Sequence, residues 1–432
     1  MTVWIVNPFD NLPSEGYRPQ RYWLMARAFA QAGHRTTYWT SDFSHAHKAP
    51  RKLDGIDDLA DACGFRMKFV PTKPYPTNIC LRRILSHRAF ARTWRKLAEA
   101  ESERPDVVIA SLPPLSSCAA ALEFCRRAGA RFIVDVQDAW PETFYRVAPA
   151  WMFAPFRATA RRIYRSADAV TAVATRYIEL AKSYGATAPS HLCHLGISLC
   201  EVNGERRKVK GVVKDERRKV KDEVNGERRK VKGEVNGERR KVKDESIHTS
   251  PFTFHPSPFT PQTPFTLLYL GAMGASYDLE TVIDAVKEME DVELDIAGSG
   301  PKESALRARA EDCSRIRFHG YLAENDLQML LSKADAGVIP MFPDSCVGVP
   351  NKLADYAAAG LRVVNSLPGE TADIVARFSA GVFYDAGSVE SFKAAVRDLQ
   401  KKEASGFLPD AFRDFFDSRR LYASYVDFVQ TL

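Results

Sequence analysis

The sequence predicts an α/β protein made of two domains with the same kind of architecture. Strand-length apolar runs alternate with amphipathic segments through residues 1–200 and again through 265–410, a pattern typical of a parallel sheet covered by helices. Several of the predicted strands end in glycine-containing turns. Between the two halves, residues 201–264 change abruptly to a charged, low-complexity composition, which predicts an insert between the domains.

Composition narrows the class of protein. A length of 432 residues suits two or three domains. The formal net charge is +7, but Glu201–Glu245 alone holds 17 Lys and Arg against 11 Asp and Glu, so the basic pI gives no argument for nucleic acid. The eight cysteines show neither zinc spacing nor a disulfide pattern. Without a signal-like start or a run of about 18 apolar residues, the chain is expected to be cytoplasmic.

The first predicted unit is a strand, a helix and a second strand. Val3–Asn7 and Arg35–Thr40 have the apolar content of strands, and Tyr22–Ala32 has helical periodicity. The loop between them contains Gly16 and leads to Arg21 at the start of the helix. Phosphate binding is therefore possible at Gly16 and Arg21, and an ordinary surface loop is the alternative.

Later strands of the first half point to a catalytic carboxylate. Strands are predicted over Asp106–Ala110, Arg131–Val136 and Ala169–Ala174. Asp138 and Trp140 come directly after the second of these. Open α/β sheets bind ligands beyond the carboxyl ends of their strands, so Asp138 is a candidate catalytic or acceptor-side residue, with Trp140 beside it. The alternative is that Asp138 only caps a turn.

Two segments of the first half are rich in arginine and in large apolar side chains. Asn78–Ala98 and Phe144–Arg165 have the composition of basic amphipathic helices. Such helices can lie on an anionic membrane surface, which predicts peripheral membrane contact. Alternatively, they bury their apolar sides in the domain and expose their arginines.

The insert begins with four tandem 11-residue repeats over residues 201–244. Valine is their only apolar residue type, and three of the four contain Asn-Gly, so they offer no core and predict disorder. The repeats also lack aromatic side chains on which bases could stack, so no nucleic-acid partner is expected.

The second half contains four further predicted strands, each followed by a turn. The strands are Phe265–Leu270, Val292–Ala297, Arg315–His319 and Ala336–Pro340. The turns contain Gly271, Gly274, Gly298, Gly300 and Tyr321. Because parallel strands place their carboxyl ends at one edge, we expect these turns to face one crevice, where glycine lets a ligand approach the backbone.

A short helix predicted over Pro350–Ala359 should open towards the same crevice. Proline suits the first helical position, and Gly360 stands just past the last. The unpaired N–H groups, the helix dipole and Lys352 in the first turn together predict an anion site. Asp355 lies on the same face of the predicted helix as Lys352 and could accept hydrogen bonds from ribose hydroxyls. A surface Lys/Asp pair is the alternative.

These motifs together resemble those of a known family. They are Gln137–Glu142, Tyr269–Gly274, Gly298–Pro301, Phe318–Tyr321 and Pro350–Tyr356. The chain resembles the retaining GT-B glycosyltransferases of family 4, in particular bacterial surface-polysaccharide transferases. The resemblance implies two Rossmann-like domains facing a central cleft.

The resemblance also assigns the domains. Residues 1–200, joined by a C-terminal helix over 411–432, would bind the acceptor, and residues 265–410 would bind a nucleotide-sugar. Tyr321 would lie near the base and Asp355 near the ribose. The diphosphate would lie near four consecutive residues, Val349, Pro350, Asn351 and Lys352.

The sequence departs from the family pattern at two positions. Val347 stands where the family places the first of two acidic residues, and no Lys or Arg follows Gly274. Lys352 would then be the main cation on the leaving diphosphate, and no metal or cofactor is expected. Asp138, Lys352 and Asp355 are the candidate catalytic residues.

The expected function is transfer of a sugar from a nucleotide donor, most simply a UDP-sugar, with retention at the anomeric carbon. The acceptor would be lipid-linked or a polysaccharide, in cell-surface glycan biosynthesis at the inner face of the plasma membrane. A nucleotide-sugar epimerase of the same fold and an inactive sugar-nucleotide-binding protein remain alternatives. The sequence names neither the sugar nor the acceptor.

Overall fold

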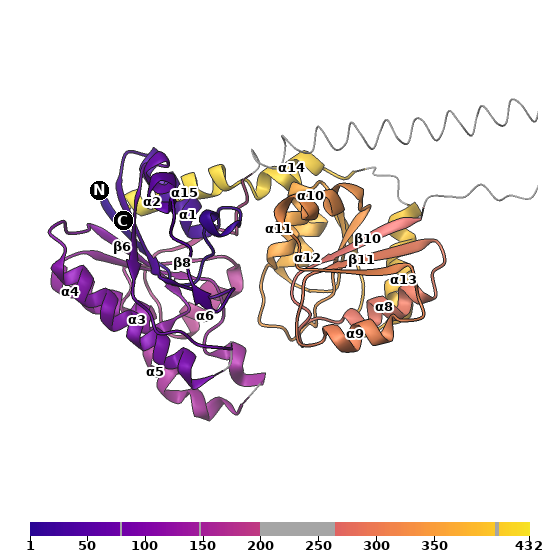
Figure 1. Ribbon diagram of the computed structural model, residues 1–432, viewed down its shortest axis with the longest axis horizontal. Helices are drawn as coiled ribbons and strands as arrows, with labels where there is room; N and C mark the ends of the chain where they lie inside the picture. The colour runs from indigo at the N-terminus through magenta and orange to yellow at the C-terminus, as the bar shows by residue number, and fades with distance from the viewer. Residues whose placement is uncertain (78–79, 147, 199–263, 402–405) are drawn as a thin grey trace, which may run out of the picture.

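The computed structural model describes residues 1–77, 80–146, 148–198, 264–401 and 406–432 (Figure 1). Within these residues the chain forms two α/β domains, each built around its own parallel sheet. The predicted fold class is therefore confirmed. The repeats predicted over 201–244 lie outside the described residues.

The N-terminal domain contains a seven-stranded sheet in which all neighbours are parallel, in the order β5-β2-β1-β6-β7-β8-β9. Its strands are β1 (Thr2–Val6), β2 (Arg35–Ser41), β5 (Arg66–Val70), β6 (Val107–Leu112), β7 (Arg131–Val136), β8 (Ala169–Ala172) and β9 (Ser190–Leu192). A short antiparallel ribbon, β3 (Phe43–Ser44) with β4 (Ala49–Pro50), follows β2 and was not predicted.

Both faces of this sheet are buried. Side chains alternate along a strand, so Val3 and Ile5 enter one core while Trp4 and Val6 enter the other. Trp4 stacks on Phe124, with ring centroids 5.5 Å apart. The helices of the domain are α1 (Arg21–Gln31), α2 (Ile56–Ala62), α3 (Leu81–Ala100), α4 (Leu115–Ala128), α5 (Ala154–Ser166) and α6 (Thr175–Ser183). Burial on both faces explains why the strands are almost continuously apolar.

The C-terminal domain contains a six-stranded parallel sheet in the order β12-β11-β10-β13-β14-β15. Its strands are β10 (Phe265–Leu270), β11 (Val292–Ala297), β12 (Ile316–Gly320), β13 (Ala336–Ile339), β14 (Arg362–Asn365) and β15 (Gly381–Phe383). Its helices are α8 (Leu279–Lys287), α9 (Glu303–Arg309), α10 (Glu324–Lys333), α11 (Asn351–Ala358), α12 (Glu370–Arg377) and α13 (Val389–Lys401). In both sheets the strand order reverses beside the first strand, where such folds bind ligands.

Tyr356 holds α11 against the centre of the second sheet. Its ring lies against β13 at Gly337, where an added Cβ would come within 2.4 Å of the ring. Its hydroxyl accepts the N–H of Leu270 (3.1 Å) and donates to the carbonyl of Leu268 (2.9 Å). Helix α11 is therefore fixed relative to the end of β10.

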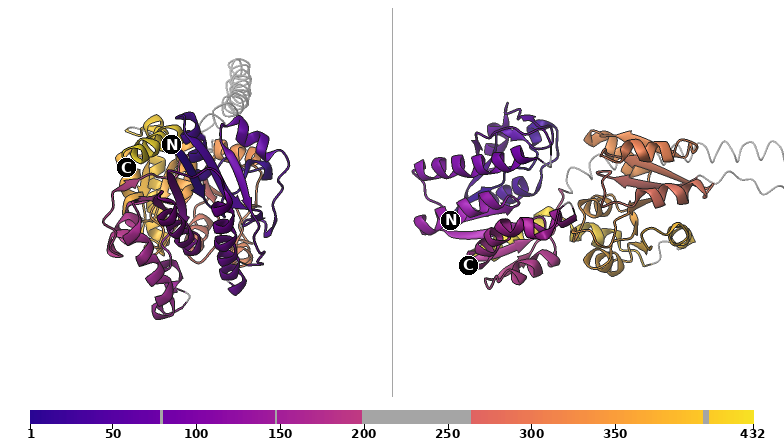
Figure 2. Two further views of the ribbon diagram at one scale, coloured as in Figure 1. Left: turned by 90° about the vertical axis from the view of Figure 1, so that its left-hand side faces the viewer. Right: turned by 90° about the horizontal axis from the view of Figure 1, so that it is seen from below.

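The chain returns to the first domain at its C-terminus. Two helices, α14 (Pro409–Phe415) and α15 (Ser418–Gln430), occupy the region for which one continuous helix was predicted. Helix α15 packs against α1, and Tyr422 and Tyr425 enter the N-terminal core. Figures 1 and 2 show the yellow C-terminal helix lying on the first domain, with the two chain ends close together.

Among the described helices, none has both the length and the apolar character needed to cross a membrane. The described part of the basic segment predicted over 78–98 lies mostly in α3. The described part of the segment predicted over 144–165 lies in the short helices η2 (Glu142–Arg146) and η3 (Ala150–Phe153) and in α5, whereas residues 78, 79 and 147 lie outside the described residues.

Candidate active site

The predicted anion site lies at the start of α11. Pro350 is the N-cap residue of this helix, with φ −75° and ψ 142°, so the helix begins one residue later than predicted. Val349 and Pro350 are buried, whereas Asn351 is exposed. The first N–H groups of α11 have no intrahelical partner, and the helix dipole adds positive potential at the same point.

Lys352 is buried at this helix start, with only 5% of its surface exposed. Its Nζ lies 3.9 Å from the ring centroid of Tyr269 and 4.1 Å from that of Tyr277. Within the described residues this ammonium has no hydrogen-bond acceptor. Burial holds the pKa of Lys352 well below its usual value, although nearby Asp355 opposes the shift. Lys352 Nζ therefore lies buried against two aromatic faces, where a protonated amine would be stabilised by both rings, and no carboxylate of the described residues is hydrogen-bonded to it.

The two glycine turns of the C-terminal domain pack on each other beside Lys352. Gly271 has a φ of +125°, and an added Cβ there would lie 3.5 Å from the Lys352 Nζ. A Cβ on Gly298 would lie 2.0 Å from the Gly271 carbonyl oxygen, and one on Gly300 would lie 2.6 Å from the backbone of Met273. Close backbone packing between the turns therefore already requires Gly298 and Gly300. Gly274 faces open space.

Asp355 is paired across the domains. Its carboxylate forms an ion pair with Arg18, which belongs to the loop between β1 and α1. The neighbouring Tyr17 places its ring edge-on to Tyr321, with centroids 6.2 Å apart. Tyr321 is 69% exposed. The N-terminal loop therefore contacts both residues that were predicted to hold the nucleoside.

Gly16 lies in the same N-terminal loop. It has a φ of +81° at the end of the short helix η1 (Pro13–Glu15) and faces open space. Its left-handed conformation, which favours glycine, turns the chain towards Tyr17 and Arg18.

The loop before α11 is held by the N-terminus of α6. Arg176 Nη1 donates to the carbonyl oxygens of Ser345 and Val347, both at 2.9 Å. Gly348 lies so close to α6 that an added Cβ would come within 2.4 Å of the Ala174 Cβ. Val347, which stands in place of the family's first acidic residue, is therefore anchored through its backbone. Arg18 and Arg176 are site residues that the sequence alone did not indicate.

Asp138 lies in the turn after β7. Its Oδ1 accepts hydrogen bonds from the Ala139 N–H (2.8 Å) and from the Thr143 hydroxyl (3.1 Å), so it does cap this turn. Burial raises the pKa of Asp138, while these two bonds and the charges of Arg83 and Arg176 oppose the rise. Arg176 therefore acts on both features: its charge lowers the pKa of Asp138, and its side chain donates hydrogen bonds to the loop before α11.

Trp140 is 8% exposed and packs edge-on to Phe144, with ring centroids 4.7 Å apart. The Arg83 guanidinium lies 5.7 Å from the centroid of the Trp140 ring. Trp140 therefore lies beside Asp138 as the sequence predicted, largely buried and flanked by a cation.

Arg21 is a correction to the sequence prediction. Its side chain is buried and forms a bidentate pair with Asp135 of β7, at 2.9 and 2.8 Å. Its remaining Nη1 donates to the Cys193 carbonyl at 3.0 Å. Burial raises the pKa of Asp135, but the charge and hydrogen bonds of Arg21, together with the hydrogen bonds from Tyr22 and Thr171, outweigh it and hold that pKa below its usual value. Arg21 links β7 to the segment after β9 and, beside the rings of Tyr422 and Tyr425, to α15, so its side chain is engaged within the domain.

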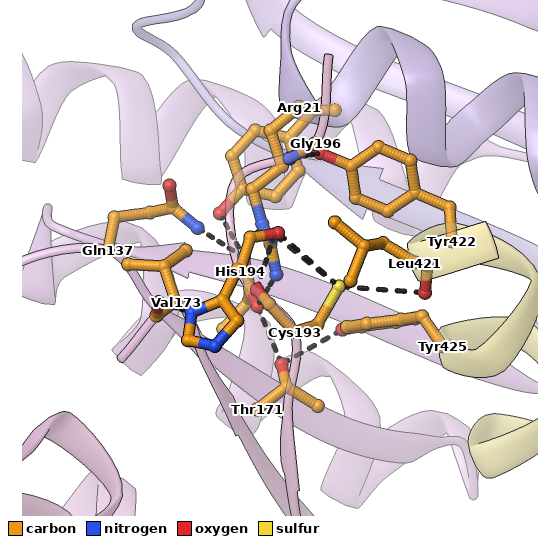
Figure 3. A network of polar contacts seen from close by, with 12 residues as sticks. Arg21, Gln137, Thr171, Val173, Cys193, His194, Gly196, Leu421, Tyr422 and Tyr425 are labelled. Atoms are coloured by element: carbon orange, nitrogen blue, oxygen red, sulfur yellow. Dashed lines mark hydrogen bonds and ion pairs between the residues drawn. The ribbon is translucent and has the colours of Figure 1, made fainter. Parts of the chain in front are cut away.

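The buried pair is surrounded by hydroxyls and an amide. Asp135 accepts from Tyr22, Thr171 at 2.7 Å and Gln137 at 2.7 Å. The Tyr425 hydroxyl of α15 lies 2.9 Å from that of Thr171 (Figure 3). Such saturation is what a buried carboxylate requires, and it ties the C-terminal helix to the first sheet.

Among the described residues, no group of three or more His, Cys, Asp or Glu side chains is arranged to hold a metal ion.

Family models match the sequence of both domains. The Glycosyltransferase Family 4 model matches residues 21–200, and the model for Glycosyl transferases group 1 matches residues 264–402. The chain belongs to the GT-B glycosyltransferases. The two models cover both domains of this transferase and leave out the insert, as the sequence motifs implied.

Solved structures agree on the fold of the transferase. HepE from Anabaena, solved with UDP and glucose, has a TM-score of 0.63 at 11% identity and 100% coverage of both chains. Sucrose-phosphate synthase from Thermosynechococcus elongatus has a TM-score of 0.67 at 12% identity, covering 100% of this chain and 99% of its own. The lipopolysaccharide outer core galactosyltransferase WaaB has a TM-score of 0.58 at 13% identity with full coverage of both. No curated protein matches the sequence.

Proposed function

We propose that this transferase moves a sugar from a UDP-sugar to a lipid-linked or polysaccharide acceptor, with retention at the anomeric carbon. The buried amine of Lys352 at the open start of α11, which has no hydrogen-bond acceptor among the described residues, carries the proposal, because a bound anion would favour its protonated form. A cation without a carboxylate partner is suited to an anionic ligand, and the helix N–H groups and dipole favour the same charge. HepE, which shares the fold, was solved with UDP-glucose.

The C-terminal domain would supply the donor site. The diphosphate would lie at Val349 to Lys352, and Lys352 would stabilise the charge that develops as the bond between C1 and the phosphate oxygen breaks. With Lys352 and the helix N–H groups in place, no metal is required. Asp355 would exchange its Arg18 partner for the ribose hydroxyls, and Tyr321 would lie near the base.

The N-terminal domain would supply the acceptor. A bond forms between the acceptor oxygen and C1, and the acceptor hydroxyl loses its proton to Asp138 or to the leaving phosphate. Asp138 has the raised pKa of a half-buried carboxyl, which makes it a better base than a solvated one. Its hydrogen bonds to Ala139 and Thr143 fix its direction.

The acceptor domain also carries a surface suited to an anionic membrane. Phe90 and Trp94 of α3 are buried, so part of this helix packs on the domain. Four large apolar side chains nearer the helix starts are exposed, namely Leu81, Leu85, Trp151 and Met152. The adjoining arginines of α3 and α5 complement anionic headgroups. We expect binding to vesicles containing phosphatidylglycerol, measured by sedimentation, with weaker binding after Trp151→Ser. Equal binding by both proteins would exclude this surface.

Release of UDP tests the activity. The full chain is incubated with a panel of UDP-sugars, with and without a bacterial lipid extract, and UDP is measured. A transferase releases UDP with one donor only when the extract is present. An epimerase converts a donor without releasing UDP, and an inactive binding protein does neither.

A further inference from the structure

The N-terminal end of α6 contacts two segments of the C-terminal domain. One is the loop before α11, over residues 345–348, and the other is Glu370, the first residue of α12. On the side of α6 the contacts are made by Thr175, Arg176 and Tyr177, and we call the whole contact the α6 junction. The proposed function assigns no role to these three side chains.

Arg176 binds the loop before α11 through backbone carbonyls. Its Nη1 donates to the carbonyl oxygens of Ser345 and Val347, both at 2.9 Å. The Tyr177 hydroxyl donates to the carbonyl of Cys346, between them, at 3.2 Å. Hydrogen bonds from an ionised donor are roughly twice as strong as those from a neutral one, so Arg176 contributes more to this contact than Tyr177 does.

Glu370 caps α6 from the other domain. The N-cap residue of α6 is Ala174, whose side chain has no oxygen to accept a hydrogen bond from the helix. The carboxylate of Glu370 accepts from the Thr175 N–H at 2.7 Å and from the Thr175 hydroxyl at 2.9 Å. His194 Nε2 lies 3.6 Å from the same carboxylate. The start of α6 thus obtains from the C-terminal domain the cap that its own sequence lacks.

The loop of the α6 junction is also held within its own domain. The carbonyl of Gly348 accepts the buried Thr371 hydroxyl at 2.9 Å. Only Val349 separates Gly348 from Pro350, the N-cap residue of α11, and Tyr356 bonds that helix to the second sheet. The loop and α11 therefore have their own supports in the C-terminal domain. What the junction adds is the position of the N-terminal domain relative to them.

The charge of Arg176 also acts on the acceptor side. Burial raises the pKa of Asp138, and the charges of Arg83 and Arg176 oppose the rise. Burial and then the charge of Asp138 raise the pKa of Tyr177, the neighbour of Arg176 in α6. The α6 junction therefore lies within electrostatic range of the carboxylate assigned to the acceptor.

We propose that Arg176 is a positioning residue for sugar transfer, whose bonds to the loop before α11 fix Asp138 relative to the donor site at Lys352. The inference rests on the proposed function, because it concerns the same two sites. Asp138 and Lys352 lie in different domains, so the distance between them depends on the contacts between the domains. A misplacement of about 1 Å can reduce the rate of a reaction by about 100-fold.

Arg176→Gln removes the charged donor and tests this role. At saturating donor and acceptor, transfer should slow by about tenfold to 100-fold. UDP affinity, measured by calorimetry, should stay within about threefold of the parent, because the donor site keeps its own supports. Lys182→Gln is the matched control, since Lys182 is exposed on the same helix, and it should change neither quantity. Parental transfer by Arg176→Gln, or an equal loss of UDP affinity, would overturn the proposal.

The pH profile of transfer separates this role from a general loss of structure. Asp138 accepts a proton only in its ionised form, so transfer should fall as the pH decreases through its pKa. Arg176 lowers that pKa, so Arg176→Gln should move the fall to higher pH, and Arg176→Lys, which keeps the charge, should return it towards the parental position. A lower rate at every pH with an unchanged profile would show that Arg176 does not act on Asp138, which contradicts the proposal.

Hydrogen exchange, measured by mass spectrometry, reports the α6 junction without any transfer reaction. The Thr175 N–H is bonded to Glu370 only while the domains are in contact, so it should exchange faster in Arg176→Gln than in the parent or in Lys182→Gln. Unchanged exchange would mean that Arg176 does not hold the domains in place, and the proposal would fail while sugar transfer still stood. If exchange is faster but the parent releases UDP from no donor, the junction stands, and the proposed function fails together with the positioning role.

Discussion

Replacing Lys352 by methionine separates stability from catalysis at one position. Burying an unpaired ammonium costs several kcal/mol, and two cation–π contacts return about 2 kcal/mol each when desolvated. These terms nearly cancel, and methionine fills a similar volume without charge. The free energy of unfolding should therefore change by no more than about 2 kcal/mol, in contrast to the loss of about 3–5 kcal/mol that follows removal of one partner of a buried ion pair.

Catalysis should respond very differently. Loss of one preorganised charge stabiliser typically removes about 2–4 kcal/mol of transition-state stabilisation, so kcat/KM should fall by about 30-fold to 1,000-fold. Lys302→Met is the matched control in the same domain. Lys302 is partly exposed and pairs with Glu280 at 2.7 Å, so its loss should cost at most about 1 kcal/mol and leave transfer unchanged.

The lowered pKa of Lys352 also predicts how the free energy of unfolding changes with pH. Burial lowers the pKa of Lys352 in the folded state, so between that pKa and about 10.5 the unfolded chain binds the extra proton. The stability contributed by this position therefore rises with pH through that window, and Lys352→Met removes the rise. Urea denaturation without ligand, at several pH values, measures it. Transfer at the parental rate would refute the site, and a loss of 3–5 kcal/mol, as for a buried pair, would refute the unpaired state of Lys352.

Three further predictions follow from the remaining contacts. Arg21→Met leaves the buried Asp135 without its counterion and should lower the unfolding free energy by about 3–5 kcal/mol in urea, whereas a loss under 1 kcal/mol would mean that the pair is not maintained in solution. Asp138→Asn should reduce transfer at saturating donor by about 100-fold to 10,000-fold, with UDP affinity unchanged by calorimetry; normal transfer would leave Asp138 as a turn cap only. Deleting Glu201–Glu245 should leave the melting temperature unchanged, because the repeats contain no apolar side chains beyond valine, and a large decrease would contradict that.

Much of the architecture was predictable because several central strands are apolar runs that can be recognised from the local sequence. The apolar run Val292–Ala297 forms β11 with the predicted bounds, and Ala336–Pro340 is one residue longer than β13. Helix α11 begins one residue later than predicted, because Pro350 caps the helix. Length, periodicity and turn residues suffice for such elements, since they depend on neighbours in the sequence.

Contacts between distant residues were not predictable in the same way. Arg21 stands at a helix start after a glycine-containing loop, which locally resembles a ligand site, yet its partner Asp135 comes from a strand far along the chain. Two further contacts depend on how the domains pack against each other. They are the ion pair between Arg18 and Asp355 and the hydrogen bonds from Arg176 to the loop before α11. The sequence offered one signal for Arg21, since Asp135 is a charged residue within the apolar run that follows Arg131 in β7.

The anomeric configuration of the product tests the central claim most directly. The full chain is supplied with the α-linked UDP-sugar that the release screen identifies and with lipid extract, and the glycosylated product is purified. The proton NMR coupling at the anomeric position of the transferred sugar then reports its configuration. A retaining transferase yields an α-linked product. A β-linked product, or a free sugar with no linkage to an acceptor, would contradict the account.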